Sequence, residues 1–116
     1  MKRISDSELK VFEIVWDNQP ITAKNICLIA KDKVNWAINT TYTVVTQMVR
    51  KGLLKREEPK FLISATVTRE EVQSSEFDYL VKRFFKNSKS TLFSALVDEG
   101  KIDKDDIEEL RKLIEK

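Results

Sequence analysis

Hydrogen-bonding side chains concentrate on one side of the segment 38–51, and their types suit contacts with base edges and phosphates. With about 100° between successive residues of a helix, the segment separates into a polar and an apolar side. Asparagine and glutamine amides can pair with adenine, and threonine methyl groups can contact the thymine methyl group. The polar side, which we predict to contact DNA, carries Asn39, Thr40, Tyr42, Thr43, Thr46, Gln47 and Arg50. The opposite side carries Thr41, Val44, Val45 and Met48.

This polar side differs from a helix face that is merely solvated. Solvated faces are usually built from Glu and Lys, which favour the helix, whereas the threonines found here are poor helix formers. No acidic residue lies between Asp32 and Glu57, so no carboxylate in that stretch repels phosphate. The alternative is a β-prone segment, but the two-sided pattern and the stop at Gly52 favour a helix.

Cations near this segment are candidates for phosphate contacts. They are Lys51, Lys55, Arg56 and Lys60. The alternative for each is an ordinary solvated lysine or arginine. The acidic pair Glu57 and Glu58 lies in the turn next to them and argues against insertion of that turn into a DNA groove.

Local signals mark the ends of the helices that must hold this segment. Ser5 and Glu8 have the spacing of a capping box, and Pro20 ends the first helix. Thr22 is the predicted N-cap of a second helix. Gly52 supplies the C-terminal stop of the third helix.

Three helices followed by a hairpin are typical of a winged helix-turn-helix, which we predict over residues 1–67. The second and third helices are expected at 23–32 and 38–51, with a short extended piece at 34–36 between them. The hairpin combines the β-rich runs 53–56 and 61–67 around a turn at 57–60.

Residues 68–116 contain three predicted amphipathic helices and no strand. The first is expected over 69–87, and the second stops near Gly100. Their predicted N-terminal caps are Thr68 with Glu71, Ser90, and Asp103 with Asp106.

These three helices have more apolar surface than one small tail can bury, so we expect a homodimer. The alternative is that they pack back on the N-terminal domain. The predicted dimerisation residues are Val72, Tyr79, Leu80, Phe84, Leu92, Phe93, Leu96, Val97, Ile107, Leu110, Leu113 and Ile114. The expected fold class is therefore mainly α with a small β-wing: a winged helix-turn-helix DNA-binding domain plus a C-terminal three-helix dimerisation region.

Composition argues against catalysis. The 116 residues include no histidine, one cysteine (Cys27) and 2 glycines, so we expect no catalytic residue, metal site or cofactor.

Residues 1–67 hold 11 Lys or Arg and 7 Asp or Glu, a net charge of +4, and residues 68–116 have a net charge of −2. This asymmetry suits a nucleic-acid reader joined to another region. The chain shows neither an apolar run that could span a bilayer nor a signal peptide, so a cytoplasmic location is expected.

The order of these motifs resembles the penicillinase and methicillin-resistance repressors, a family that includes copper-responsive relatives. The resemblance covers nearly the whole chain. It is carried by Ile4-Ser5-x-x-Glu8-x-x-Val11-x-x-Ile14-x-Trp16, by Trp36 followed by Thr40-x-x-Thr43-x-x-Thr46-x-x-x-x-Lys51-Gly52, by Val67-Thr68-Arg69-Glu70-Glu71, and by Asp105-Asp106-Ile107-Glu108-Glu109-Leu110.

The resemblance implies a homodimer that binds a palindromic operator and represses a promoter. In the β-lactam branch, a membrane sensor with a zinc protease domain triggers cleavage in the dimerisation region. The family often has arginine at the positions of Tyr42 and Gln47, so the operator here is expected to differ. Its cleaved bond is Asn-Phe, whereas the matching position here is Ala95-Leu96, and the cysteine-rich tail of the copper branch is missing.

Two functional hypotheses follow. The first is a dimeric repressor that an inducing signal releases from double-stranded operator DNA, with the membrane sensor protease as a partner to be tested. The second is a winged-helix module that docks another protein without reading DNA, because fold does not fix function. The polar side of 38–51 favours the first, since only Tyr42 on it is large and apolar.

Overall fold

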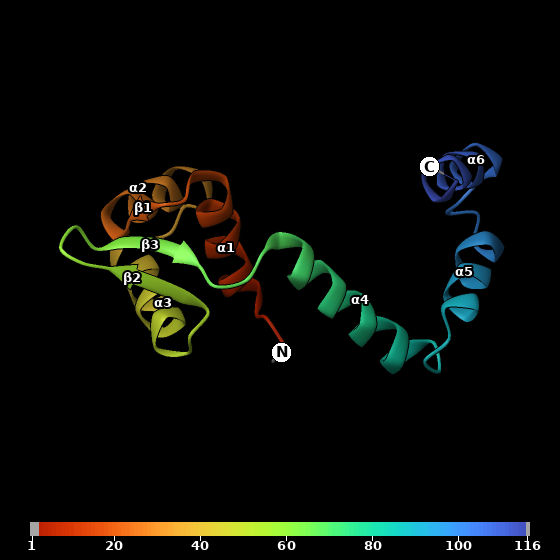
Figure 1. The fold of residues 1–116 in the computed structure, drawn as a ribbon, viewed down its shortest axis with the longest axis horizontal. Helices are drawn as coiled ribbons and strands as arrows, with labels where there is room; N and C mark the ends of the chain where they lie inside the picture. The colour runs from red at the N-terminus through yellow and green to blue at the C-terminus, as the bar shows by residue number, and fades with distance from the viewer. Residues whose placement is uncertain (1–2, 116) are drawn as a thin grey trace. The chain divides into compact units, whose positions relative to one another are not determined.

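Figure 1 shows the computed structural model, which describes residues 3–115. Over these residues the chain forms six helices and one three-stranded sheet, which confirms the mainly α class with a small β-wing. The chain divides between Ser75 and Glu76 into two compact units. This division lies inside helix α4 (Arg69–Phe84), so the N-terminal unit includes the beginning of α4 as well as the winged helix.

Helix α1 (Asp6–Asn18) begins at the predicted capping box. The Ser5 hydroxyl accepts from the Glu8 backbone N–H at 3.2 Å, and the Glu8 carboxylate accepts from the Ser5 N–H at 2.9 Å. These two bonds satisfy donors that the first turn of a helix leaves without helical partners. The helix ends at the residue before Gln19, and Pro20 then prevents its continuation.

Helices α2 (Ala23–Lys33) and α3 (Ile38–Arg50) follow as the helix-turn-helix. The Thr22 hydroxyl accepts from the Asn25 N–H at 3.2 Å and caps α2, as predicted. The piece 34–36 is not extended, contrary to our expectation. Val34 still has helical dihedrals, and Asn35 lies in the left-handed region at φ 59°, a conformation that asparagine tolerates well, so the chain reverses there.

The sheet contains β1 (Ile21–Thr22), β2 (Leu54–Glu57) and β3 (Leu62–Ala65), in the order β1-β3-β2 with both pairs antiparallel. Strands β2 and β3 form the predicted hairpin, the wing, but each occupies only four residues. Phe61 was expected inside the second strand but lies in the left-handed region at φ 54°, so it belongs to the turn. Strand β1 was not predicted.

The core of the N-terminal unit lies where the three helices meet the sheet (Figure 1). Burial of each large apolar side chain contributes about 1.5–3 kcal/mol, so this shared core fixes the inner side of α3 against α1 and the wing. The largest fully buried side chains are Phe12, Ile26, Met48, Leu54, Ile63, Val11, Val15 and Thr41. Cys27 is also buried, which raises the pKa of its thiol, and its Sγ lies 3.7 Å from the carbonyl oxygen of Ile38.

The C-terminal helices differ from expectation at two ends. Helix α4 ends at Phe84 rather than at 87, because Lys86 and Asn87 both have positive φ. Helix α5 (Lys89–Asp98) is capped by Ser88, which accepts from the Thr91 N–H at 3.2 Å, and not by Ser90.

Helix α6 (Lys104–Ile114) begins at the predicted capping box of Asp103 and Asp106. The Asp103 carboxylate accepts from the Asp106 N–H at 2.9 Å, and the Asp106 carboxylate accepts from the Asp103 N–H at 3.0 Å. Within residues 3–115, no helix is both long and apolar enough to cross a membrane.

Candidate nucleic-acid interface

Helix α3 has the two-sided character that its sequence predicted. Its inner side is buried, with Thr41 and Met48 at 0% and Val45 at 3% exposure. Its outer side is exposed, and Tyr42 keeps 54% of its surface accessible. All seven residues that the sequence placed on the polar side are exposed: Asn39, Thr40, Tyr42, Thr43, Thr46, Gln47 and Arg50. The core therefore presents this polar side to solvent as one surface.

Two threonines on the outer side bond back to their own helix. The Thr43 hydroxyl donates to the Asn39 carbonyl at 2.9 Å, and the Thr46 hydroxyl donates to the Tyr42 carbonyl at 2.8 Å. A hydroxyl has one donor hydrogen and two acceptor lone pairs, so these groups keep acceptor capacity for a ligand. They can accept from a base amino group, but a contact with a phosphate oxygen would require breaking the helix bond.

A grooved surface lies between α3 and the wing. It consists of two hollows of about 220 and 380 Å³ that share Ala23, Tyr42 and Arg56. Three cations line this surface besides Arg56: Lys24 from α2, Arg50 from α3 and Lys60 from the wing turn. Among residues 3–115, the structure gives none of these three an acidic partner. The groove therefore combines positive charge with the exposed aromatic side chains of Tyr42 and Phe61.

Sequence reasoning missed Lys24 and Phe61 as members of this surface. Lys24 lies in the first turn of α2, two residues after the Thr22 cap, and only the packing of α2 against α3 brings it near Tyr42. The helix-turn-helix order could have indicated it, because that motif places its first helix across the DNA backbone.

The wing cations are partly neutralised within the wing. Lys55 pairs with Glu57 at 3.3 Å, and Arg56 pairs with Glu58 at 3.4 Å. The Arg56 guanidinium also lies 5.4 Å from the ring centroid of Phe61. All four charged side chains are about half exposed or more, so each pair contributes about 0–1 kcal/mol and can exchange its partner for another anion.

Comparison with known proteins agrees with this architecture. The chain matches the family described as Penicillinase repressor over residues 4–116, which is nearly its entire length. The chain belongs to the Penicillinase repressor family.

Relatives match this family member along almost its whole length. The methicillin resistance regulatory protein MecI of Staphylococcus aureus (strain N315) is 24% identical over 115 residues, which cover 97% of this chain and 94% of that protein. MecI of Mammaliicoccus sciuri has the same identity and coverage. An uncharacterised 16.5 kDa protein encoded in the ptsI 3′ region of Latilactobacillus sakei is 27% identical over 113 residues, covering 96% of this chain and 77% of that protein.

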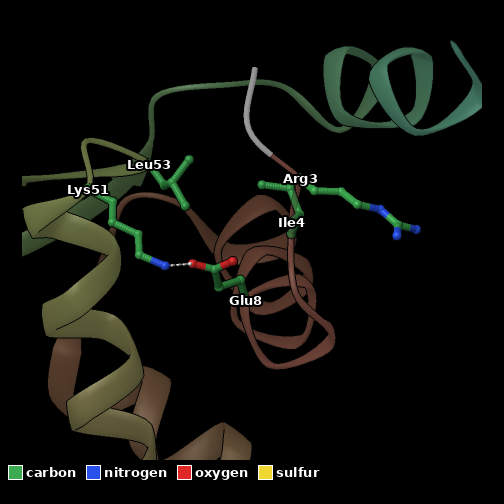
Figure 2. Close-up of a pocket in the computed structure, with 5 residues that line it drawn as sticks. All are labelled: Arg3, Ile4, Glu8, Lys51 and Leu53. Carbon is green, nitrogen blue, oxygen red and sulfur yellow. Dashed lines mark hydrogen bonds and ion pairs between the residues drawn. The ribbon is translucent and has the colours of Figure 1, made fainter. Parts of the chain in front are cut away.

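In this family member, Lys51 has a partner inside the protein. Its Nζ lies 2.9 Å from Oε2 of Glu8, and the Glu8 side chain is only 9% exposed. The pair lies beside a cavity of about 350 Å³ that Arg3, Ile4 and Leu53 also line. Figure 2 shows these five side chains. The sequence predicts that Lys51 contacts phosphate, and the structure shows that it also has an acidic partner within the protein.

The predicted dimerisation residues of this family member fall into two groups. Val72, in the N-terminal unit, and Leu92, in α5, are buried in the chain itself, and Tyr79, Leu96 and Leu110 are half-buried. The others are exposed in the single chain: Leu80, Phe84, Phe93, Val97, Ile107, Leu113 and Ile114. Phe77, at 41% exposure, belongs with these and was not predicted. Ala95 and Leu96 are half-buried within α5.

Proposed function

We propose that this protein is a dimeric transcriptional repressor that binds a palindromic operator through α3. The observation that carries the proposal is the exposed outer side of α3, which offers amide, hydroxyl and guanidinium groups and no carboxylate. Such a helix fits the major groove, where amides and guanidinium groups distinguish base pairs. Membership of the Penicillinase repressor family supports the same function, and no catalytic role is part of the proposal.

The groove beside α3 supplies the complementary phosphate contacts in this proposal. A DNA strand that passes between α3 and the wing would meet Lys24 and Lys60. Phosphate contacts fix the register of the protein on the duplex, while contacts with base edges give the sequence preference. Arg56 and Lys55 can join them by exchanging Glu58 and Glu57 for phosphate.

The exposed apolar side chains of the C-terminal unit support the homodimer. Large apolar groups such as Phe84, at 62% exposure, and Ile114, at 81%, are costly in water, and a second copy can cover them symmetrically. A two-fold dimer presents two copies of α3 to half-sites one or more helical turns apart. A repressor must reach the chromosome, which in bacteria lies in the cytoplasm. We therefore propose a cytoplasmic location.

Release of the operator is proposed to follow an inducing signal that weakens the dimer. Cleavage between Ala95 and Leu96 by a membrane sensor protease is the route that the family resemblance suggests. Since this bond lies within α5, a protease would need α5 to unfold locally first. The mass of the protein before and after induction in cells shows directly whether the bond is cut.

Fluorescence anisotropy tests the proposal. The purified protein is titrated against a labelled duplex from its own upstream promoter and against a scrambled duplex. We expect at least about a 10³-fold preference for the promoter, with two chains per site. Equal, weak and strongly salt-dependent binding to both duplexes would reflect phosphate attraction alone. No binding to either at low salt would favour the alternative of a protein-docking module.

A further inference from the structure

One ion pair joins the first turn of α1 to the end of α3. Glu8 Oε2 accepts from Lys51 Nζ at 2.9 Å, and Glu8 Oε1 accepts from the Ser5 backbone N–H at 2.9 Å. Both oxygens of the carboxylate therefore have partners, and Glu8 is only 7% exposed. Figure 2 shows the Lys51 side chain reaching from the end of α3 to the Glu8 carboxylate on α1.

We propose that Glu8 and Lys51 are positioning residues for DNA recognition, which hold the C-terminal end of α3 in the place where it reads bases. The inference rests on the proposed DNA-binding function. In this role the acidic Glu8 supports DNA binding without touching DNA. Lys51 holds α3 in place and does not contact phosphate.

Lys51 lies where a side-chain contact can fix the position of the C-terminal end of α3. It is the C-cap of α3, and its backbone N–H donates to the Gln47 carbonyl at 2.9 Å. Gly52 follows at φ 81°, and the chain then turns into the wing. Gln47 and Arg50, two of the candidate contacts with DNA, lie in the last turn before this cap, so a shift of the cap moves both.

Because Glu8 is buried, water cannot easily take the place of Lys51 beside its carboxylate. A buried carboxylate that loses its charged partner keeps the cost of its desolvation, so the surrounding structure must adjust to bring water or another donor to it. The cavity beside the pair provides room for that adjustment. The adjustment would move the α1–α3 contact at the end that carries Gln47 and Arg50.

The alternative is that Lys51 contacts phosphate and Glu8 only caps α1. The two roles predict opposite signs for Glu8→Gln. Simple electrostatics predicts tighter binding to every DNA, because a negative charge is removed. The positioning role predicts weaker binding to the operator and little change with scrambled DNA, because only base reading depends on the placement of α3.

Glu8→Gln is the first variant to measure, by anisotropy on the promoter and scrambled duplexes. The glutamine oxygen can still accept from the Ser5 N–H, so the capping box is kept. We expect about a tenfold loss of operator affinity, comparable to the loss of one base contact. Asp6→Asn, which removes the same charge from the same turn of α1 outside the pair, is the matched control: it measures the effect of the charge alone and is expected to show no loss of operator affinity.

Lys51→Met is the second variant, and it keeps the test valid if Glu8→Gln folds poorly, because the Lys51 side chain is 60% exposed. We expect the same tenfold loss on the operator, an unchanged salt slope, and recovery in Lys51→Arg, which can still pair with Glu8. The double variant Glu8→Gln/Lys51→Met is expected to be no worse than either single variant.

Two results would overturn the inference while leaving the repressor function intact. One is operator binding by Glu8→Gln that equals or exceeds that of the wild type. The other is an equal loss on both duplexes in Lys51→Met, with the salt slope lowered by about 0.9 per chain, since that result identifies a phosphate contact. If the wild type itself shows no operator preference, the proposed function fails, and this inference fails with it.

Discussion

Arg69 lies over the ring of Trp16, with 5.2 Å between the guanidinium carbon and the ring centroid. The same guanidinium donates to Glu13 at 2.8 Å and to Asp17 at 2.9 Å, and Trp16 Nε1 donates to the Val67 carbonyl at 3.0 Å. These contacts attach the beginning of α4 to the C-terminal half of α1. They provide a physical reason why the N-terminal unit includes the first residues of α4.

Arg69→Ala is expected to lower the thermal stability of the N-terminal unit by a small amount, because the ion pairs are exposed and only the ring contact is partly desolvated. We predict a decrease of about 2–4 °C in the melting temperature, which shrinks at high salt. Circular dichroism melts at low and high salt measure it. Lys82→Ala, which removes an exposed cation further along α4, is the control, and an identical small change in both variants would contradict a specific role for Arg69.

Thr46→Ala is expected to weaken operator binding about tenfold and to leave the fold and the dimer intact. Alanine is the better helix former, so the melting temperature should stay the same or rise. Anisotropy titrations and sedimentation measure the two properties separately. Unchanged operator affinity would mean that this side of α3 does not face the bases.

Lys60→Ala is expected to weaken binding to operator and scrambled DNA alike and to lower the salt slope by about 0.9 per chain. Lys104→Ala is the matched control, because Lys104 belongs to α6 and does not line the groove, so its loss should leave the slope unchanged. Titrations between about 50 and 200 mM salt measure both slopes. Equal slopes in the two variants would show that the groove beside α3 does not carry the DNA strand.

Phe84→Glu is expected to dissociate the dimer. An aromatic side chain buried at the centre of an interface contributes about 2 kcal/mol or more, so the dissociation constant should rise at least about 30-fold. Sedimentation equilibrium measures this constant, and Lys82→Glu provides a control on the same helix. A wild-type protein that is already monomeric at micromolar concentration would exclude the proposed dimer.

The ion pair of Glu8 also predicts how stability changes with pH. Burial raises the pKa of Glu8, but the hydrogen bonds from Ser5 and Lys51 together with the charge of Lys51 outweigh it, so the pKa lies below its ordinary value. The contribution of Glu8 is therefore fully present above the unfolded pKa of about 4.3 and is lost as pH falls through the folded pKa.

Chemical denaturation at several pH values tests this contribution. The difference in unfolding free energy between the wild type and Glu8→Gln should be largest near pH 7 and should shrink below about pH 4.3. Asp6→Asn is again the control. A difference that grows as the pH falls would show that the folded protein does not favour the charged form of Glu8.

Most helix caps, which depend on residues close in sequence, were predicted correctly. The caps at Ser5, Thr22 and Asp103 each involve a partner three residues away, so the chain itself brings the groups together. The two sides of α3 follow from the helical period alone. Ser90 is not the cap because α5 begins earlier, at Lys89, and Ser88 accepts from the Thr91 N–H at the helix start.

Features that depend on distant residues were not predicted. Strand β1 has two residues and exists only because Ile21 pairs with Ile63 of β3. Glu8 and Lys51 are 43 positions apart, so the sequence could assign each a local role but not their pairing. The positive φ of Asn35 is a local feature that was also missed, because a sequence clearly indicates that conformation only at glycine.

Hydroxyl-radical footprinting of the upstream promoter tests the central claim most directly, namely that two copies of α3 read two half-sites. We expect two protected regions on one face of the duplex, with centres separated by one helical turn of about 10–10.5 base pairs or a multiple of it. Both protections should weaken together in Thr46→Ala. A single protected region, or protection that is uniform along the duplex and equal on scrambled DNA, would contradict the account.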